Sequence, residues 1–462
     1  MSAIPRQFDF SGKRVLVYTL GIEGRDLARW FVGQGAEVTI SDTRTEEQLA
    51  TAGATAPEGV ARVVCGQPLL EAGGFDLLAT GQSVLRHDPA MGRARSAGVP
   101  RISQMQLFLD LCPAPVVGIT GSSGKSTTTA LVGKIAEKAG LKPIIGGNLA
   151  DIGLLGQLAA ITPDSTVILE ISHTQLQYTG RSPHIAAVTN VTPNHLDQFS
   201  WDEYVGLKRN ILSHQHAADI AVLNADDHTS RQFVTEVKGR LFRTSIVGEV
   251  AGDGAWQEAD RIHVRAGKRA HAVMPRAAIR LRGEHNLANV VMACGIAAAA
   301  GFPESAMAEA TATFAGVPHR LEIVGRALGA TWVNDSIATS PERTIAGLNS
   351  FSEPVVLLLG GREKRLPLDG LQKSVRERCR SVICFGESGP VFEEALRGCA
   401  PTTTLVATLA DAVARATEAV EAGDAVLLSP AGTSFDAYPS FEVRGQAFRD
   451  LVWSMQGFEE VH

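Results

Sequence analysis

One stretch, GITGSSGKSTTTALVG at residues 118–133, limits what this chain can fold into more than any other feature. It follows an apolar run typical of a buried strand and leads into a sequence with helical character over 125–139. Glycines, a lysine and a hydroxyl residue in this order are typical of a P-loop. There, backbone N–H groups surround phosphate oxygens, the lysine meets the terminal phosphates and the hydroxyl binds Mg²⁺. The sequence therefore predicts an α/β domain that binds a nucleoside triphosphate.

The loop departs from the usual spacing at one position, because Ile119 stands where a further glycine is expected. The alternative is a plain glycine-rich turn with a solvated lysine, but the strand–loop–helix context favours a phosphate site. A guanine-reading N-K-x-D segment is missing, since LNADD at 223–227 lacks the lysine, and this favours ATP. The residues predicted to contact ATP here are Gly121, Ser122, Ser123, Gly124, Lys125, Ser126 and Thr127.

Length and composition restrict the class of protein. A chain of 462 residues predicts roughly three domains. A net charge of −6 offers no basic field for nucleic acid. The sequence has no signal pattern and no apolar run of about 18 residues, so we expect a cytoplasmic protein that does not bind a membrane. The six cysteines lack metal-site spacing and are predicted to be small buried hydrophobic residues.

The chain divides into three predicted α/β domains. Residues 1–112 begin with strand, glycine turn, helix and strand, ending at Asp42, although Thr19 replaces the first glycine of a dinucleotide fingerprint and a plain βαβ turn stays open. Residues 113–316 carry the P-loop among strands that alternate with helices, and residues 317–462 hold four more buried strands. The predicted fold is a Rossmann-like N-terminal domain, a central P-loop ATPase-type parallel sheet and a C-terminal Rossmann-like domain.

Three residues outside the loop are candidates for chemistry. Glu170 ends the strand STVILE, and His195 follows the strand AAVTN. Either residue alone is more often structural, but two of them at strand ends beside a P-loop suit Mg²⁺ around phosphates. Lys208 in DEYVGLKRNIL lies on an amphipathic helix, and composition alone predicts a solvated lysine there.

These segments, together with others, resemble the Mur ligases, the ATP-dependent amide-forming enzymes of peptidoglycan synthesis. Ten motifs appear in the family's order over about 330 residues. They are GITGSSGKSTTTALVG, GGNLA, LEISHTQL, NVTPNHLDQF, YVGLKRNI, GEHNLAN, PHRLE, NDSIATSPE, GGREK and SPAGTSFDAYPSFEVRG.

The resemblance assigns roles to individual positions. It implies that the catalytic residues are Lys125, His195 and Lys208, with Lys208 carried as a carbamate. It implies Mg²⁺ ligation by Ser126, Glu170, His195 and the modified Lys208. Further ATP contacts would come from Asn286, Asn289, Arg320 and Asp335, and His319 would lie at the junction before the third domain. Substrate contacts would come from Asp42, Thr43 and Arg44 for uridine, Asn148 and Ser172 for the muramoyl group, and Thr339, Lys364, Ser434 and Phe441 on the glutamate side.

The implied reaction joins D-glutamate to UDP-N-acetylmuramoyl-L-alanine through an acyl phosphate, in a monomeric enzyme using ATP and Mg²⁺. Several positions depart from the family pattern. His173-Thr174 replaces Ser-Phe, and Ile337 stands where many members have lysine, which leaves amino-acid recognition open. The alternatives are the same ligation with L-glutamate, a folylpolyglutamate-type ligase and a non-catalytic nucleotide-binding switch. The first 112 residues and SPAGTSFD disfavour the second of these, and the Lys125, Glu170, His195 and Lys208 set disfavours the third.

Overall fold

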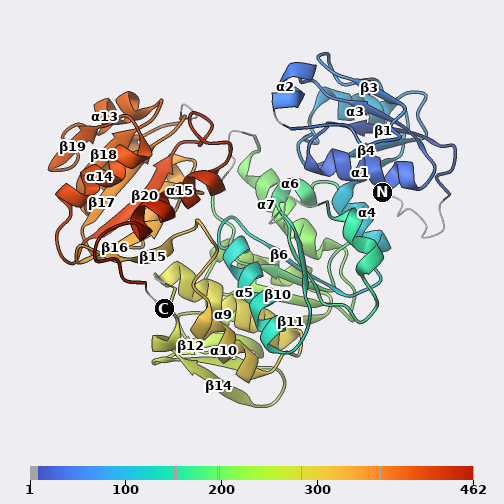
Figure 1. The fold of residues 1–462 in the computed structure, drawn as a ribbon. Coiled ribbons are helices and arrows are strands. Elements are labelled where there is room, and N and C mark those ends of the chain that lie inside the picture. Colours follow the sequence, from blue (N-terminus) through green and yellow to red (C-terminus); the bar gives the residue numbers. More distant parts are fainter. Residues whose placement is uncertain are drawn as a thin grey trace. The chain divides into compact units, whose positions relative to one another are not determined.

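The computed structural model describes residues 9–51, 53–148, 153–194, 196, 198–281, 283–363 and 366–460. The chain forms two compact units. The first runs up to Ile279 and includes Leu287–Thr313, and the second combines Arg280–Asn286 with the chain from Phe314 onward. The first unit contains two β-sheets and the second contains one (Figure 1).

The first sheet has five parallel strands in the order β3-β2-β1-β4-β5. This is the order of a doubly wound nucleotide-binding half, so the predicted Rossmann-like N-terminal fold is confirmed. The strands are β1 (Arg14–Tyr18), β2 (Glu37–Ser41), β3 (Arg62–Val64), β4 (Leu77–Thr80) and β5 (Arg101–Ser103). The helices are α1 (Ile22–Gly33), α2 (Glu46–Thr51), α3 (Pro89–Ser96) and α4 (Gln104–Leu111).

The turn between β1 and α1 keeps the geometry of a dinucleotide fingerprint although its first glycine is missing. Thr19 takes that place with a φ of 68°, a left-handed conformation that is unusual for a β-branched residue. Gly24 comes so close to the strand that an added Cβ would lie 1.8 Å from the carbonyl oxygen of Thr19. The turn therefore depends on Gly24 for the close approach of helix and strand.

We expect Gly24→Ala to lower the free energy of unfolding by about 2–3 kcal/mol, because the new methyl group would overlap backbone atoms that cannot move aside freely. Gly33→Ala in the same helix is the matched control, since nothing lies within 4 Å of its added Cβ. That variant should be neutral or slightly more stable, because alanine is the better helix former. Urea denaturation followed by circular dichroism checks both, and equal stability of the two variants would contradict the packing argument.

The second sheet has nine strands in the order β14-β13-β12-β11-β10-β9-β6-β8-β7. Strands β12, β11, β10, β9, β6, β8 and β7 are parallel to one another. At the other edge of the sheet, β13 pairs antiparallel with β12, and β14 pairs antiparallel with β13. The strands are β6 (Val116–Thr120), β7 (Ile144–Gly147), β8 (Val167–Glu170), β9 (Ile185–Val188), β10 (Ile220–Asn224), β11 (Arg240–Ser245), β12 (Asp253–Glu258), β13 (Arg261–Arg265) and β14 (Ala270–Pro275). The predicted central parallel sheet is confirmed.

Helices connect these strands. They are α5 (Lys125–Lys138), α6 (His173–Leu176), α7 (Trp201–Ser213), α8 (His228–Gln232), α9 (Glu284–Ala299) and α10 (Glu304–Thr313), with short 3₁₀ turns η1 (Leu155–Ala160), η2 (Phe233–Glu236) and η3 (Arg276–Ala278). Phe31 of α1 and Ile211 of α7 belong to the same hydrophobic core. The two sheets of this unit are therefore joined by one continuous set of buried side chains.

The third sheet, in the second unit, has the order β15-β16-β20-β17-β18-β19. Only the β15–β16 pair is antiparallel. The strands are β15 (Glu322–Ala327), β16 (Ala330–Asn334), β17 (Val355–Gly360), β18 (Cys379–Phe385), β19 (Thr402–Leu405) and β20 (Ala425–Ala431). The helices are α11 (Pro341–Leu348), α12 (Asp369–Arg378), α13 (Gly389–Leu396), α14 (Leu409–Ala419) and α15 (Phe441–Trp453).

Residues of β17 alternate between two cores, as expected of a sheet covered on both faces. Leu357 and Leu359 belong to the core with α12 and α13, whereas Val356 and Leu358 belong to the core with α14 and α15. The four predicted strands are β16, β17, β18 and β20, and the sequence reading missed the two edge strands. The predicted domain boundaries stay predictions, although α4 ends at Leu111 and β6 begins only at Val116.

Two predictions from composition can be compared with the described residues. All six cysteines are free; five are buried as expected, and Cys65 is half-buried. Every helix in the described ranges is too short or too polar to cross a bilayer.

Candidate active site

The P-loop forms a tight turn between β6 and α5. Lys125 folds back over it, and its Nζ donates to the carbonyl oxygens of Gly121 at 2.8 Å and Ser122 at 3.3 Å. Gly124 is the N-cap of α5, with a φ of +79°, and an added Cβ there would lie 2.1 Å from Oδ1 of Asn289. A side chain at position 124 would therefore collide with the Asn289 amide, so the close contact between the loop and α9 requires glycine there.

The segment after β9 braces this loop. The backbone N–H of Ser122 donates to the carbonyl oxygen of Asn190 at 2.9 Å, and that of Ser123 donates to its Oδ1 at 3.0 Å. The hydroxyl of Ser122 lies 3.0 Å from that of Tyr204. The N–H groups of the two serines are thus engaged within the protein. The first N–H groups of α5 lack acceptors in their own helix, and they are the donors that suit a phosphate.

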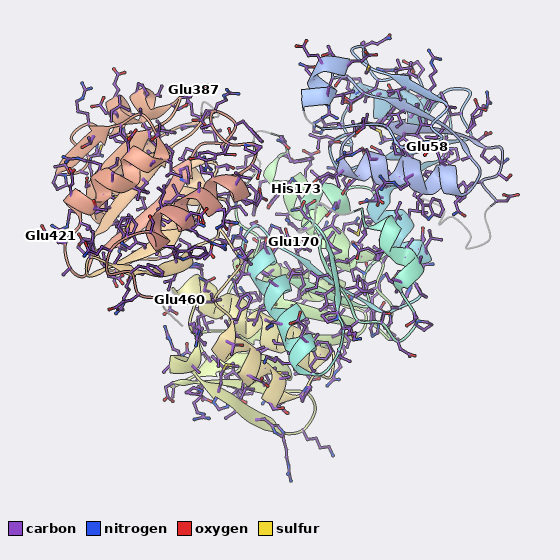
Figure 2. The ribbon with its side chains drawn as sticks, in the orientation of Figure 1. Glu58, Glu170, His173, Glu387, Glu421 and Glu460 are labelled. Atoms are coloured by element: carbon purple, nitrogen blue, oxygen red, sulfur yellow. The ribbon has the colours of Figure 1, made fainter. Side chains whose placement is uncertain are left out.

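Glu170 lies at the carboxyl end of β8, beside β6 and β7 in the parallel register, and is labelled in Figure 2. The side chain is buried, and its Oε1 accepts from Nδ2 of Asn148 at 3.1 Å. Its Oε2 is buried with no hydrogen-bond partner among the described residues. An unsatisfied buried carboxylate oxygen is costly, and a bound cation would satisfy it, so the position fits Mg²⁺.

The structure otherwise leaves the metal site incomplete. The described ranges contain no group of three His, Cys, Asp or Glu side chains that could hold a metal ion. His195, the second predicted ligand at a strand end, lies outside the described residues. His173, also labelled in Figure 2, is three residues after Glu170 and packs against the rings of Phe199 and Tyr204.

Lys208 is buried, with only 1% of its surface exposed, so the solvated lysine expected from composition alone is wrong. The helix α7 packs against β6 and β9, and an amphipathic pattern cannot tell which of its polar residues this contact covers. Nζ of Lys208 donates to the carbonyl oxygen of Gly121 at 2.8 Å and to the hydroxyl of Thr120 at 3.2 Å. Burial, and secondarily the charge of Lys125, lower the pKa of Lys208 well below its usual value, against the opposing effect of Glu170.

The uridine candidates follow β2. Asp42 accepts from the backbone N–H of Leu20 and from the Arg44 guanidinium, each at 2.6 Å. Burial opposes ionisation of Asp42, but these hydrogen bonds outweigh it and lower the pKa of that carboxyl. Thr43 is exposed between them. The three residues form a loop at the carboxyl end of β2 that the Asp42 hydrogen bonds hold in place.

The structure also brings Asn148, Ser172 and Glu170 together. Ser172 caps α6 through a capping box with Gln175, and its hydroxyl donates to Oε1 of Gln82 at 2.8 Å. Nε2 of the same glutamine lies 3.4 Å from Oδ1 of Asn148. Gln82, from the loop after β4, was missed by the sequence reading, since an isolated polar loop residue carries no signal of a contact 90 residues away.

In the second unit, Asp335 follows β16 and is buried. Its carboxylate accepts from the Ser429 hydroxyl at 2.8 Å and from the Leu321 N–H at 3.2 Å. Burial raises the pKa of Asp335 to about 7, although the Ser429 hydrogen bond and the charge of Arg320 act to lower it. His319 has a φ of 63° and lies 3.0 Å, through Nδ1, from Nδ2 of Asn334.

This pKa predicts a pH-dependent stability. The folded state keeps the Asp335 proton up to about pH 7, whereas the unfolded chain releases it near pH 4. Its contribution to stability is therefore present below about pH 4 and lost as the pH rises towards 7. The free energy of unfolding of Asp335→Asn, relative to that of the wild type, should rise by about 1.4 kcal/mol per pH unit between about pH 5 and 7. Unfolding curves at several pH values check this, and a constant difference between the proteins would contradict it.

The remaining residues predicted to bind glutamate or ATP lie on several different elements. Ser434 is buried in the loop after β20, and Phe441 begins α15 with its ring 6.3 Å from that of His319. Thr339 is half-buried before α11, and Asn286 and Asn289 are both buried residues of α9. Lys364 lies outside the described residues.

Sequence reasoning also missed Arg444, which is completely buried. Its guanidinium donates to the carbonyl oxygen of Ser336 at 2.8 Å and to that of Gly432 at 3.1 Å. The loops that follow β16 and β20 are therefore tied to α15. Arg444 lies in the motif SPAGTSFDAYPSFEVRG, but a single arginine in a motif does not predict burial.

A triphosphate-binding loop next to a buried acid and a buried lysine, on a parallel sheet with two further α/β sheets, defines an ATP-dependent enzyme. Comparison with known proteins identifies the family. Residues 119–297 match the Mur ligase middle domain, and residues 319–432 match the Mur ligase, glutamate ligase domain.

Two relatives show how far the similarity extends. The UDP-N-acetylmuramoylalanine–D-glutamate ligase of Symbiobacterium thermophilum is 41% identical over 445 residues, covering 95% of this chain and 98% of that protein. The enzyme of that name from Clostridium botulinum strain Langeland is 34% identical over 449 residues, covering 95% and 96%. The chain belongs to the Mur ligase family.

A solved structure agrees in fold. The UDP-N-acetylmuramate–alanine ligase of Thermotoga maritima is 18% identical, with a TM-score of 0.58, covering 96% of this chain and all of that one. The family expected from the motifs is confirmed, and with it an ATP-dependent ligase of peptidoglycan synthesis acting on small molecules. The non-catalytic switch and the folylpolyglutamate-type ligase are left without support.

Proposed function

We propose that this enzyme joins D-glutamate to UDP-N-acetylmuramoyl-L-alanine, converting ATP to ADP and phosphate. The printed names of the relatives support this substrate pair. The observation that carries the proposed chemistry is that two lysines from different helices meet at one loop, since Lys125 of α5 and Lys208 of α7 each donate to the carbonyl oxygen of Gly121 at 2.8 Å. The Lys125 amine at the edge of a phosphate loop suits a reaction in which negative charge is transferred and must be stabilised, and the buried Lys208 amine lies beside the same loop.

The reaction requires activation of a carboxylate. A carboxylate oxygen of the alanyl group attacks the γ-phosphorus of ATP, and ADP leaves with the electrons of the broken P–O bond. The amine of glutamate then attacks the carbonyl carbon of the acyl phosphate, and phosphate leaves as the amide forms. Lys125 and the first N–H groups of α5 would neutralise the phosphoryl oxygens. Neither step requires a covalent bond to the enzyme.

Mg²⁺ would be held by Ser126, Glu170 and His195, and when bound it would offset phosphoryl charge. The buried Oε2 of Glu170, without a hydrogen-bond partner among the described residues, supports this assignment. Asn286, Asn289, Arg320 and Asp335 would hold the rest of ATP.

Lys208 is proposed to carry a carbamate, formed by addition of its amine to CO₂. Addition requires the neutral amine, and burial with the neighbouring charge of Lys125 lowers the pKa of Lys208 in the needed direction. A carbamate would convert a buried amine into an anion close to the phosphate loop.

The substrate contacts are proposed in three groups. Asp42, Thr43 and Arg44 would bind uridine, and Asn148 and Ser172 would face the muramoyl group. Glutamate would be bound by Thr339, Lys364, Ser434 and Phe441, and the enzyme would act as a monomer.

The test is a ligation assay with ATP, UDP-N-acetylmuramoyl-L-alanine and either D- or L-glutamate, followed by mass spectrometry of the product and by phosphate release. We expect product and stoichiometric phosphate with D-glutamate only. Equal turnover of the two enantiomers would contradict the stereochemistry. Phosphate release unaffected by both substrates would contradict ligation.

A further inference from the structure

A network of side chains links the first sheet to the second, outside the catalytic roles assigned above. It consists of Glu23, Gln82, Gln175, Ser172 and Asn148, and we refer to it as the Glu23 network. It starts in the first turn of α1 and ends at Asn148, whose amide contacts Glu170. All of these residues belong to the first unit.

Glu23 holds two partners and no cation. One carboxylate oxygen accepts the backbone N–H of Gln82, and the other accepts Nε2 of Gln175 at 2.7 Å. Lys and Arg side chains of the described ranges form no ion pair with Glu23, so its two neutral partners hold it in place. Because 152 residues separate it from Gln175, Glu23 joins two distant parts of the chain.

The Glu23 carboxyl group fixes the orientation of the Gln175 amide. Both oxygens of Glu23 accept hydrogen bonds, so Gln175 presents its Nε2 to Glu23 and its Oε1 to the other side. That Oε1 accepts the backbone N–H of Ser172 at 3.0 Å. The amide orientation of Gln175, and through it the position of Ser172, therefore depends on Glu23.

Gln82 continues the network by its side chain. Its Oε1 accepts from the hydroxyls of Ser172 at 2.8 Å and Thr174 at 3.0 Å, which directs its Nε2 towards Oδ1 of Asn148. Nδ2 of Asn148 is then directed to Glu170. Thr174 stands where the family pattern has phenylalanine, so this chain supplies a hydroxyl to Gln82 that a phenylalanine could not.

We propose that Glu23 and Gln82 are positioning residues that orient Ser172 and Asn148 towards the muramoyl-alanine part of the substrate. The inference rests on the proposed function, which assigns Ser172 and Asn148 to that substrate. Neither Glu23 nor Gln82 touches the P-loop in any described contact. Their loss should therefore weaken binding of the UDP-linked substrate far more than binding of ATP, because the network meets Glu170 only at its far end, through Asn148.

The test uses two nearly isosteric variants and one control. Glu23→Gln places an amide donor against one of two existing donors. Gln82→Leu removes the side-chain hydrogen bonds to Ser172, Thr174 and Asn148 but keeps the backbone N–H for Glu23. Glu46→Gln, an exposed acid in the first turn of α2, is the control. Steady-state kinetics with each substrate varied in turn, calorimetric binding of UDP-N-acetylmuramoyl-L-alanine, and melting temperatures complete the design.

We expect both network variants to raise KM and the dissociation constant for the UDP-linked substrate about tenfold, the effect of one or two lost hydrogen bonds. KM for ATP should change less than about twofold, melting temperatures should stay close to wild type, and the control should match wild type throughout. Unchanged affinity for the UDP-linked substrate would overturn the proposal. So would an equal rise of all KM values together with a large loss of stability, because that pattern indicates a purely structural role.

The calorimetric arm separates this inference from the proposed function. A wild-type enzyme that binds the UDP-linked substrate but does not ligate it would refute the proposed reaction, and the variants' affinities would still decide the inference. A wild-type enzyme that neither binds nor ligates it would overturn both.

Discussion

Lys125→Ala is expected to abolish ligation, with a loss of about 10³-fold or more in kcat. The amine of Lys125 is folded over the loop, 2.8 Å from the carbonyl oxygen of Gly121, and we propose that it contacts the terminal phosphates of ATP. Alanine removes the only lysine or arginine of the loop segment 121–127, and several kcal/mol of transition-state stabilisation would disappear with it. Phosphate release and product formation under saturating substrates measure this loss.

The matched control is Lys134→Ala in the same helix. Lys134 is half-exposed, and within the described part of the chain its ion pair is with Glu137 at 2.9 Å, so its loss should leave kcat within about twofold of wild type. Circular dichroism should show both variants folded. Near-normal turnover by Lys125→Ala would refute the P-loop assignment.

Lys208→Met is expected to lose at least about 100-fold in kcat while remaining folded. Because Lys208 is buried, alanine would leave a cavity and lower the stability of the protein. Lys208→Ala would therefore not test the chemistry alone. Methionine fills similar space and cannot form a carbamate. It also removes a buried amine whose charged form is disfavoured, so the melting temperature should not fall below that of the wild type.

Dependence on CO₂ distinguishes the carbamate from a simple lysine. Wild-type activity should fall in CO₂-depleted buffer and recover with bicarbonate, whereas Lys208→Met should respond to neither. Arg209→Ala is the control on the neighbouring, half-exposed position and should behave as wild type. Wild-type rates that are independent of bicarbonate, together with an active Lys208→Met, would remove Lys208 from the catalytic set.

The sequence was sufficient for the features that local patterns encode. Apolar runs ending in chemistry-bearing residues predicted β6, β8 and β9, and the glycine and lysine spacing predicted the loop before α5. The edge strands were harder, since β19 consists of TTTL and is only partly buried, which is weak evidence for a strand. β15 is an edge strand that pairs antiparallel with β16. The prediction relied on strands that alternate with helices, and no helix separates β15 from β16.

The site was predictable only where a residue's role follows from its own motif. The burial of Lys208 depends on how α7 packs against β6 and β9, which a helical pattern does not encode. The contact of Glu23 with Gln175 joins residues 152 positions apart, and no local signal connects them. Thr19 illustrates the opposite case, because a missing glycine suggested a weaker fingerprint while the backbone adopts the glycine conformation.

The central claim is that ATP activates the substrate as an acyl phosphate, and the fate of the carboxylate oxygen tests it most directly. UDP-N-acetylmuramoyl-L-alanine carrying oxygen-18 in both carboxylate oxygens would be ligated to D-glutamate, and the phosphate released would be examined by mass spectrometry. The account predicts one labelled oxygen in each phosphate, transferred from the carboxylate, and the other label retained in the new amide. Unlabelled phosphate, or label found instead in AMP, would contradict it.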